Sequence, residues 1–273
     1  MTCHSLEPQN RPLGRFTAVA SGKGGVGKTW LSITLAQALA QDGCRVLLLD
    51  ADFGLANVDV QLGLNPQHDI GAALAGVVPF AAAVTRCPQA GFDVLAGRSG
   101  SGALSAMPDA AMDALLAAMP GIARAYDLVL LDLGAGLHAQ VRRLAAWADT
   151  LLVVATEDPT SITDAYATLK LNAADRPGGD VRLVANQAST GAGGARTAGT
   201  LVRACERFLR FAPAFAGAVR RDAHVGDAIR RQAPSLVRHP NSPASTDVRR
   251  IAQRIRPDRR GTAHLSPVQA GVA

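Results

Sequence analysis

Seven short apolar runs, separated by longer segments of helical pattern, constrain the fold of this chain more than any other feature of its sequence. Most of the runs are apolar throughout and do not alternate with polar residues. Strands buried on both faces of a parallel sheet have this pattern, because each face requires apolar side chains. The runs therefore predict strands at 16–20, 45–49, 92–96, 127–131, 150–154, 181–185 and 215–219.

The segments between the runs carry apolar residues at helical spacing. They predict helices at 28–41, 109–125, 139–148, 161–174, 198–211 and 222–232. Gly43 follows the first helix and suits the left-handed conformation that ends many helices. Ser161, with Asp164 shortly after it, indicates a capping box. The repeated alternation of strand and helix predicts a doubly wound α/β fold, with a mostly parallel sheet and helices on both faces.

The length and composition agree with one large folded domain. The chain has 273 residues, of which 48% are hydrophobic and only 4% aromatic, so the core must consist mostly of Ala, Val, Leu and Ile. We expect a flexible segment at 1–14 and the folded domain at 15–242. The remainder, 243–273, is expected to form a short helix near 246–255 and a disordered tail. The GAGGA motif at 191–195 is expected to be a flexible loop.

Cysteine spacing and net charge indicate which metal sites, cellular locations and partners to expect. The four cysteines lie far apart, without a CxxC or Cys/His ligand spacing, so neither a zinc site nor a disulfide framework is indicated. The first residues lack the apolar core of a signal peptide, and the longest apolar stretch is too short to span a bilayer. We therefore expect a soluble, cytoplasmic protein. Its net charge of +6 favours anionic partners, such as nucleotides, nucleic acids or anionic membranes.

A glycine-rich loop between the first predicted strand and the first predicted helix carries the clearest chemical signal. The loop consists of Gly22, Lys23, Gly24, Gly25, Val26, Gly27, Lys28 and Thr29. It fits the pattern G-x-x-x-x-G-K-[ST] in the strand–loop–helix context that phosphate binding requires. Glycines let backbone N–H groups surround phosphate oxygens, and the helix N-terminus adds its positive dipole end. Lys28 is predicted to reach the β- and γ-phosphates, and the Thr29 hydroxyl to bind Mg²⁺.

Acidic residues follow two of the predicted strands. Asp50 and Asp52 come after the run at 45–49, and Asp132 follows the run at 127–131. The carboxyl ends of parallel strands face the ligand crevice in folds of this kind, so these carboxylates are expected near the phosphate loop. Asp132 has the position of a Walker B aspartate that holds Mg²⁺ through water. Gly134 and Gly136 then let this segment respond to the γ-phosphate.

The loop sequence KGGVGKT resembles the deviant P-loop of the MinD/ParA ATPases, which are P-loop NTPases of the SIMIBI type. The resemblance implies ATP and Mg²⁺ as cofactors, and an ATP-dependent homodimer with ATP held between the subunits. It implies that the extra lysine, Lys23, reaches the nucleotide of the partner and acts like an arginine finger. It also implies that Asp52 orients the attacking water and that Asp50 supports the metal shell. Lys23, Lys28 and Asp52 are therefore the expected catalytic residues.

The same resemblance implies contacts to the rest of the nucleotide. Asn186 resembles the family's adenine-binding asparagine, whose amide both donates and accepts hydrogen bonds. Arg221 and Asp222, in VRRDAHV, match a loop that closes over the base. Trp30 stands where many members have a small hydroxyl residue that touches the α-phosphate, but its backbone N–H still faces the phosphate. We expect the indole to pack beside the nucleotide or under a neighbouring loop, with its Nε1–H bonded to an acceptor.

Longer phrases, among them DADFGLANVDVQLGL and AVRRDAHVGDAIRRQAPSL, resemble the flagellar-number regulators FlhG and FleN. The family resemblance covers roughly 16–242. It implies a slow, partner-stimulated ATPase that regulates flagellar number or placement. The implied partners are an FlhF-like GTPase, flagellar switch proteins or a transcription regulator. The DQAxxLR motif with which many such regulators activate a GTPase does not occur in the first residues.

Several alternatives stay open on the sequence alone. A MinD-like positioning ATPase would contact the inner face of the cell membrane through 246–255, but the apolar face there is small and favours packing within the domain. A ParA-type partition ATPase would bind DNA non-specifically through its basic surface, and the flagellar phrases argue against this. A nitrogenase-reductase-like electron carrier would need cysteines near the switch segments, which have none. A scaffold that binds nucleotide without hydrolysis is favoured by Trp30 alone.

Overall fold

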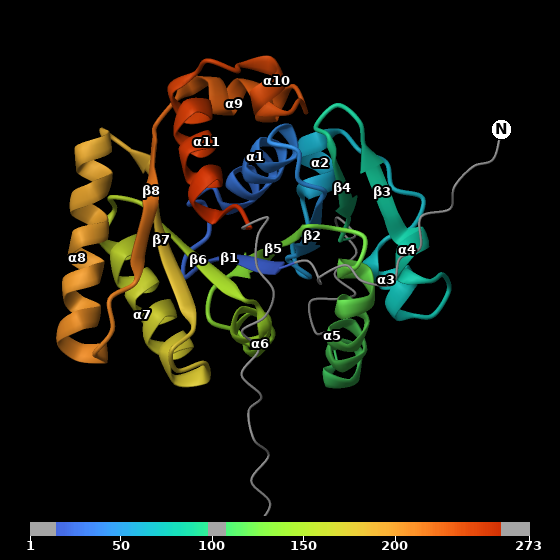
Figure 1. The fold of residues 1–273 in the computed structure, drawn as a ribbon, viewed down its shortest axis with the longest axis horizontal. Coiled ribbons are helices and arrows are strands. Elements are labelled where there is room, and N and C mark those ends of the chain that lie inside the picture. Colours follow the sequence, from blue (N-terminus) through green and yellow to red (C-terminus); the bar gives the residue numbers. More distant parts are fainter. Residues whose placement is uncertain (1–14, 98–107, 258–273) are drawn as a thin grey trace, which may run out of the picture.

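The computed structural model describes residues 15–97 and 108–257, which form an α/β fold around an eight-stranded sheet (Figure 1). The strand order is β3-β4-β2-β5-β1-β6-β7-β8. The strands are β1 (Arg15–Ser21), β2 (Val46–Ala51), β3 (Val84–Cys87), β4 (Phe92–Leu95), β5 (Leu128–Ala135), β6 (Thr150–Ala155), β7 (Asp180–Ala188) and β8 (Ala214–Arg220). Each described pairing is parallel except that of β3 with β4. The predicted mostly parallel sheet is confirmed, and the antiparallel edge strand β3 is an addition to it.

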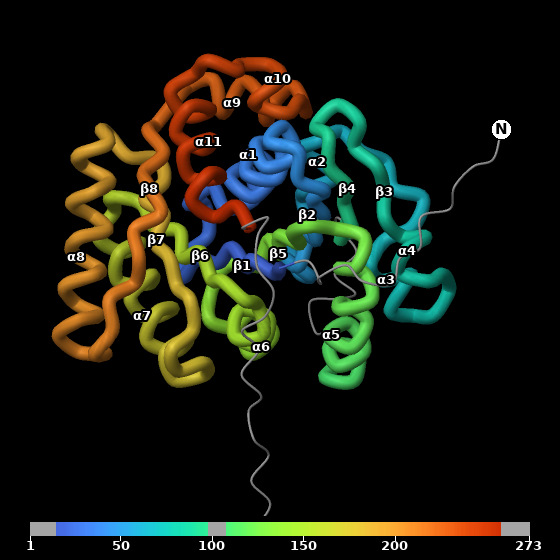
Figure 2. The backbone as a smooth tube through the Cα atoms, viewed as in Figure 1, coloured from blue at the N-terminus to red at the C-terminus, as the bar shows by residue number. Residues whose placement is uncertain are grey.

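Helices cover both faces of the sheet (Figures 1 and 2). They are α1 (Lys28–Gln41), α2 (Val58–Leu62), α3 (Ile70–Leu74), α4 (Phe80–Ala83), α5 (Asp109–Ala123), α6 (Ala139–Trp147), α7 (Pro159–Asp175), α8 (Gly191–Leu209), α9 (Ala223–Arg230), α10 (Ser235–Arg238) and α11 (Pro243–Ile255). One apolar cluster joins the sheet to α1, α2, α10 and α11, and the other joins it to α3–α8. The two layers of helices confirm the doubly wound arrangement.

Burial on both faces explains the apolar runs of the strands. In β2, Leu47 and Leu49 pack into the cluster on the α3–α8 side, whereas Leu48 packs into the cluster on the α1 side. Successive side chains of a strand point to opposite faces, so a strand between two helical layers needs apolar residues at every position. The polar exceptions lie at the carboxyl ends. There the pairing of β2 with β5 sets Asp50 directly beside Asp132.

The predicted flexible loop at 191–195 is wrong, because these residues form the first turn of α8. The Thr190 side chain caps this helix by accepting a hydrogen bond from the Gly193 N–H at 2.9 Å. A Cβ added to Gly194 would lie 2.4 Å from the Cβ of Ala218 in β8. The glycines therefore serve close packing of α8 on the sheet. From the sequence alone, glycines needed for close packing of a helix on a sheet cannot be told from glycines of a flexible loop.

The predicted capping box at Ser161 is also wrong. Helix α7 begins two residues earlier, at Pro159, and Asp158 caps it by accepting a hydrogen bond from the Thr160 N–H at 2.9 Å. The Ser161 hydroxyl is buried and accepts instead from the Thr156 N–H at 3.0 Å. Proline suits the first helical position because its missing N–H would have no partner there.

The C-terminal helix packs within the fold. It begins at Pro243, three residues before the predicted start, and its apolar residues Val248, Ile251, Ala252 and Ile255 are all buried, in the cluster that contains α1. The face considered for membrane contact at 246–255 is therefore covered by the protein itself. No helix in the described ranges is long and apolar enough to cross a bilayer. The predicted flexible segment at 1–14 and the tail from 258 onward lie outside the described residues.

Candidate functional site

The glycine-rich loop links β1 to α1 at the carboxyl edge of the sheet. Gly25 and Gly27 have φ angles of 79° and 83°, in the left-handed region that favours glycine, and Gly27 immediately precedes α1. A Cβ added to Gly22 would lie 2.3 Å from the backbone oxygen of Asp164 in α7. Nothing lies within 4 Å of the Cβ position of Gly24. The loop is thus packed closely on α7 at one end and open where a phosphate would be cradled.

Lys28, Thr29 and Asp132 come together at the start of α1, as the sequence predicts. Lys28 is only 8% exposed. Burial raises the pKa of Asp132, while the Lys28 charge and hydrogen bonds from the hydroxyls of Thr29 and Ser32 lower it. The Ser32 hydroxyl donates to Asp132 Oδ1 at 2.8 Å, a contact that sequence reasoning missed. Ser32 stands one helical turn after Thr29, and that spacing is its only signal in the sequence.

Asp50 organises the segment that follows β2. Its Oδ1 accepts a hydrogen bond from the Asp52 N–H at 3.1 Å, and its Oδ2 accepts from the N–H groups of Asn57 and Val58 at 2.9 and 3.0 Å. Burial, and then the neighbouring charge of Asp132, raise the pKa of Asp50 to about 7 despite these hydrogen bonds. Its carboxylate therefore holds the backbone of this segment, which fits a supporting place beside the metal shell.

The carboxylate of Asp52 stands over the end of β5. Its Oδ1 accepts a hydrogen bond from the Leu55 N–H at 3.1 Å. A Cβ added to Gly134 would lie 3.2 Å from the same Asp52 oxygen, which is tighter than most contacts of this kind. The absence of a side chain at Gly134 therefore lets the segment after β2 approach the end of β5. Asp52, expected to orient water, therefore lies close to Gly134, which the sequence places in the segment that responds to the γ-phosphate.

Lys23 points away from the phosphate loop of its own subunit. Its Nζ donates to Asp158 Oδ2 at 3.0 Å and to Thr160 Oγ1 at 2.6 Å, both at the start of α7. Hydrogen bonds from Lys23 and from the backbone of Thr160 lower the pKa of Asp158. The Ser21 hydroxyl fixes the loop by donating to the Lys23 carbonyl at 2.7 Å. The lysine side chain remains 41% exposed at the surface.

The side chains of Asn186 and Gln187, at the end of β7, hold the phosphate loop by hydrogen bonds to its backbone. The Asn186 amide donates to the Val26 carbonyl at 2.7 Å, and the Gln187 amide donates to the Gly25 carbonyl at 3.1 Å. A Cβ added to Gly27 would lie 2.6 Å from Asn186 Nδ2. Asn186, expected to read adenine, therefore holds the shape of the phosphate loop here, and its contact with a base stays a prediction. The role of Gln187 was missed by sequence reasoning.

Arg221 and Asp222 follow β8 at the same edge of the sheet. Arg221 is exposed, and its backbone N–H donates to the Ala188 carbonyl at 2.8 Å. Asp222 caps α9 by accepting from the His224 N–H, and it also accepts from the Ala244 N–H. Burial alone would raise the pKa of Asp222, but these hydrogen bonds lower it to about 2. The Asp222 carboxylate thus joins α9 to α11, and closure over a base stays a prediction for both residues.

The Trp30 indole lies under α10, which is one of the two placements expected from the sequence. It is 5% exposed, and its Nε1–H donates to the Ser235 hydroxyl at 2.7 Å. The backbone N–H of Leu236 donates to the side-chain oxygen of Gln37 at 3.0 Å, which ties α10 to α1 a second time. The tryptophan therefore connects the phosphate-loop helix to the segment after α9.

The arrangement fits a magnesium nucleotide. In the described part of the chain, no group of three or more His, Cys, Asp or Glu side chains could hold a metal by itself. Mg²⁺ in nucleotide sites commonly takes one or two protein oxygens and completes its shell with phosphate and water. Thr29 and Asp132 supply such oxygens beside Lys28, and the buried carboxylates of Asp50 and Asp132 lie side by side, where a cation offsets their repulsion.

Comparisons with known proteins agree with this geometry. The family model described as the CobQ/CobB/MinD/ParA nucleotide binding domain matches residues 17–257. The chain is 35% identical over 238 residues to the antiactivator FleN of Pseudomonas aeruginosa, covering 87% of this chain and 85% of that protein. It is 34% identical over 177 residues to the flagellum site-determining protein YlxH of Helicobacter pylori, covering 65% of this chain and 59% of that protein.

Solved structures show the same fold. The cell division ATPase MinD of Pyrococcus furiosus matches with a TM-score of 0.75 at 20% identity, covering 89% of this chain and 98% of that one. The MinD chain of a MinC:MinD complex from Aquifex aeolicus matches with a TM-score of 0.71 at 25% identity, covering 88% and 95%. The chain therefore belongs to the CobQ/CobB/MinD/ParA nucleotide-binding family.

Proposed function

We propose that this chain is an ATP-dependent dimerisation switch that regulates the number, placement or assembly of flagella. The flagellar part rests on its similarity to the antiactivator FleN and to the site-determining protein YlxH. The dimerisation part rests on one observation, the direction of the Lys23 side chain. This lysine belongs to the phosphate loop but is bonded to Asp158 and Thr160, outside the cradle that the loop forms.

The Lys23 contact suits a residue that changes partner. Its ion pair with Asp158 is exposed on both sides, and exposed ion pairs contribute little net stability. A phosphate group offers a stronger, charge-assisted contact in a site from which water is excluded. In the proposed dimer, Lys23 leaves α7 and reaches the phosphates held by the partner subunit. There it stabilises charge on the transferring phosphoryl group.

The remaining residues divide the work within one subunit. Lys28 meets the β- and γ-phosphates, and Thr29 and Asp132 would hold Mg²⁺, which neutralises charge on the phosphate oxygens when bound. Asp52 orients the attacking water. Because Asp52 lies close to Gly134, a movement of the segment after β2 can displace the end of β5. The close packing of these two segments thereby couples the bound nucleotide to the conformation of the surface that partner proteins bind.

Flagellar number in the organism that encodes this chain tests this proposal. The chromosomal gene is replaced by variants encoding Asp52→Ala or Lys23→Ala, and flagella are counted by electron microscopy. Asp52→Ala keeps the ATP-bound state and should change flagellar number in the direction opposite to a deletion. Lys23→Ala should resemble the deletion, because it cannot enter that state. Equal amounts of each protein in the cells are the control. Unchanged flagellation in all three strains would refute the flagellar role.

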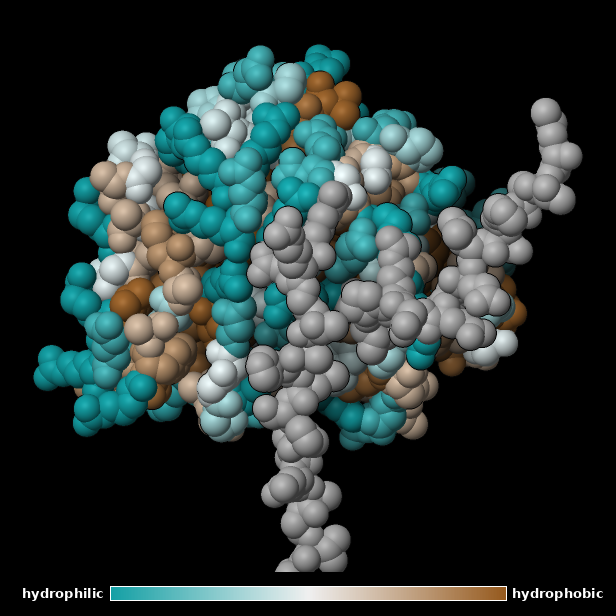
Figure 3. Space-filling view, viewed as in Figure 1, coloured by the Kyte–Doolittle hydropathy of each residue, from teal (hydrophilic) through white to brown (hydrophobic). Residues whose placement is uncertain are grey.

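One observation favours a second candidate, non-specific DNA binding. Four exposed arginines lie along α8 and form no ion pair with a described carboxylate, namely Arg196, Arg203, Arg207 and Arg210. Figure 3 shows hydrophilic side chains along the left edge of the molecule, where α8 lies. Phosphate contacts of this kind release counterions, so the affinity for DNA would fall steeply with salt. ATP-dependent, salt-sensitive DNA binding that is lost on replacing these arginines by glutamine would favour this candidate. If the protein does not bind DNA at physiological salt, or binds it equally well without ATP, this candidate is excluded.

A further inference from the structure

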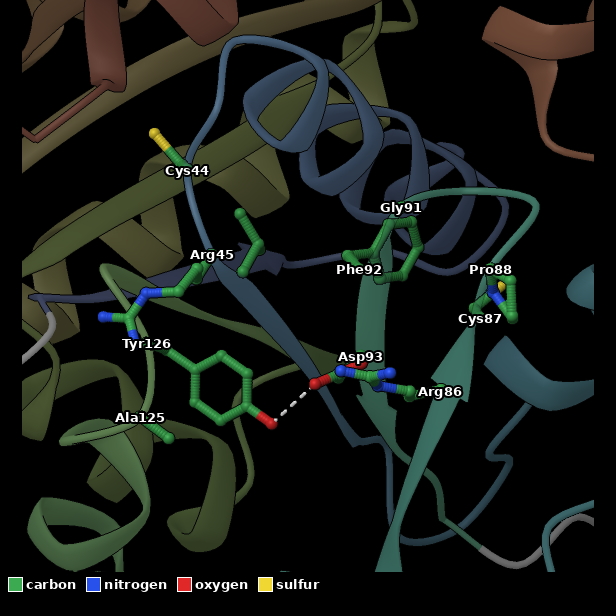
Figure 4. Close-up of a pocket in the computed structure, with 11 residues that line it drawn as sticks. Cys44, Arg45, Arg86, Cys87, Pro88, Gly91, Phe92, Asp93, Ala125 and Tyr126 are labelled. Atoms are coloured by element: carbon green, nitrogen blue, oxygen red, sulfur yellow. Dashed lines mark hydrogen bonds between the residues drawn. The ribbon is translucent and has the colours of Figure 1, made fainter. Parts of the chain in front are cut away.

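A cavity of about 410 Å³ lies at the edge of the sheet opposite the phosphate loop (Figure 4). Residues that precede β2 and β5 line it, together with the hairpin of β3 and β4. Because β3 runs antiparallel to its neighbour, the turn between these strands lies at this edge and encloses the cavity. Gly91 in that turn has a φ of 80°, which glycine adopts readily. The edge strand that departs from the parallel pattern thus builds the wall of this cavity.

Two arginines line the cavity, Arg45 before β2 and Arg86 in β3, and in Figure 4 the Arg45 guanidinium points away from Asp93 whereas that of Arg86 lies beside it. Arg45 Nη2 pairs with Asp127 Oδ1 at 3.0 Å, but the buried Arg45 Nε has no hydrogen-bond partner in the described structure. Arg86 is exposed and forms no ion pair with a residue that the structure describes. A guanidinium carries five N–H donors. Arg86 therefore offers the cavity donors that the fold itself leaves unused, whereas the buried Arg45 Nε is not accessible to a ligand.

Tyr126 and Asp93 lie between the two arginines. The Tyr126 hydroxyl donates to Asp93 Oδ2 at 2.9 Å, and Arg86 stands opposite Asp93 in the pairing of β3 with β4. Burial, and then the charge of Asp93, raise the pKa of Tyr126, so the hydroxyl stays protonated and directed at the carboxylate. One Asp93 oxygen is thereby occupied. The Arg86 guanidinium keeps its donors without a described ion-pair partner, and this favours an anion as the ligand.

The other walls are apolar. Val46, Cys87, Pro88 and the Phe92 ring line the cavity, and Val46, Cys87 and Phe92 are buried. Pockets for small organic molecules have volumes of roughly 300–1,000 Å³, and an inorganic anion would leave most of this cavity unfilled. We propose that the cavity binds a small organic anion, with its charged group held by Arg86 and its apolar body against Phe92. This site goes beyond the proposed ATPase switch and does not depend on it.

Fluorescence titration with 8-anilinonaphthalene-1-sulfonate, an aromatic sulfonate, tests the site. The full chain is titrated with the nucleotide site saturated by ADP and Mg²⁺, so that the probe cannot bind there. Arg86→Gln should weaken probe binding about tenfold or more, because it removes a charge-assisted hydrogen bond. Arg86→Lys should retain more affinity than Arg86→Gln, because the charge remains. The matched control is Arg203→Gln, which removes another exposed arginine without a described ion pair, in α8, and should leave the affinity within about twofold.

The outcomes are distinguishable. Tyr126→Phe keeps the ring but removes the hydrogen bond to Asp93, and it should also weaken probe binding, since the freed carboxylate then competes for Arg86. Thermal unfolding of every variant shows that each is folded. Equal probe affinity in wild type, Arg86→Gln and Tyr126→Phe would overturn the proposal. So would a loss of affinity in Arg203→Gln as large as that in Arg86→Gln, because the probe would then report surface charge alone.

Discussion

Replacing Ser235 by alanine isolates the contact that holds α10 against α1. Trp30 and Ser235 are each only 5% exposed, and their hydrogen bond measures 2.7 Å. Ser235→Ala leaves the indole N–H buried without an acceptor, and an unsatisfied buried donor costs about 1–3 kcal/mol. The hydrogen bond from Leu236 to Gln37 remains in this variant and still holds α10 on α1. We therefore expect the free energy of unfolding to fall by about 1–3 kcal/mol.

A double-mutant cycle separates this hydrogen bond from simple loss of packing. Trp30→Phe removes the donor, so Ser235→Ala made in that background should cost much less than it does alone. The free energy of unfolding is measured by urea titration of the far-ultraviolet circular dichroism, without nucleotide. We expect a coupling energy of about 1 kcal/mol or more between the two positions. Effects that add within about 0.5 kcal/mol would show that the indole N–H does not depend on Ser235, and would refute this placement of Trp30.

Three further predictions concern the phosphate loop and its carboxylates. Lys28→Ala should abolish measurable ATP binding by calorimetry in a folded protein, since it removes a charge-assisted phosphate contact of about 1.5–3 kcal/mol and leaves Asp132 without its cation. Gly22→Ala should lower the melting temperature, because its Cβ would lie 2.3 Å from the Asp164 carbonyl, whereas Gly24→Ala meets nothing and should not. Asp50 has a folded-state pKa raised to about 7 from 3.8, so the folded state holds the extra proton. Its stabilising contribution in the nucleotide-free protein is present below about pH 4 and is lost as pH rises towards about 7, a slope that urea unfolding should show and that Asp50→Asn should reduce.

The sequence predicts those parts of the site whose structure is determined by residues that are neighbours in the chain or by the direction of the strands. The glycine-rich loop can be recognised from adjacent residues alone, and the strand and helix that flank it have clear patterns of apolar residues. The placement of Asp50 beside Asp132 follows from strand direction, because parallel strands bring their carboxyl ends to one edge. The apolar runs predict seven strands correctly because both faces of the sheet are covered. Strand β3 lies at the edge of the sheet with only Cys87 of its four residues buried, and its short sequence VTRC has no clear pattern.

Contacts between distant segments could not be predicted in the same way. Lys23 and Asp158 are 135 positions apart, and only the packing of α7 against the phosphate loop brings them together. The acceptor of the Trp30 indole comes from α10, 205 positions later. The glycines that begin α8 are required by the closeness of β8, which their own sequence does not show. In each case a contact between residues far apart in the sequence determines the structure, and local propensity does not indicate that contact.

The size of the ATP-bound particle tests the central claim most directly, because the claim is that Lys23 completes the site of a second subunit. Light scattering coupled to gel filtration is run on Asp52→Ala with ATP and Mg²⁺, and on the same variant carrying Lys23→Ala. The first should have twice the 28.2 kDa mass of one chain, and the second should bind ATP yet keep the mass of one chain. If Asp52→Ala stays a monomer at concentrations where calorimetry shows bound ATP, or if both variants dimerise equally, then Lys23 does not act across a dimer.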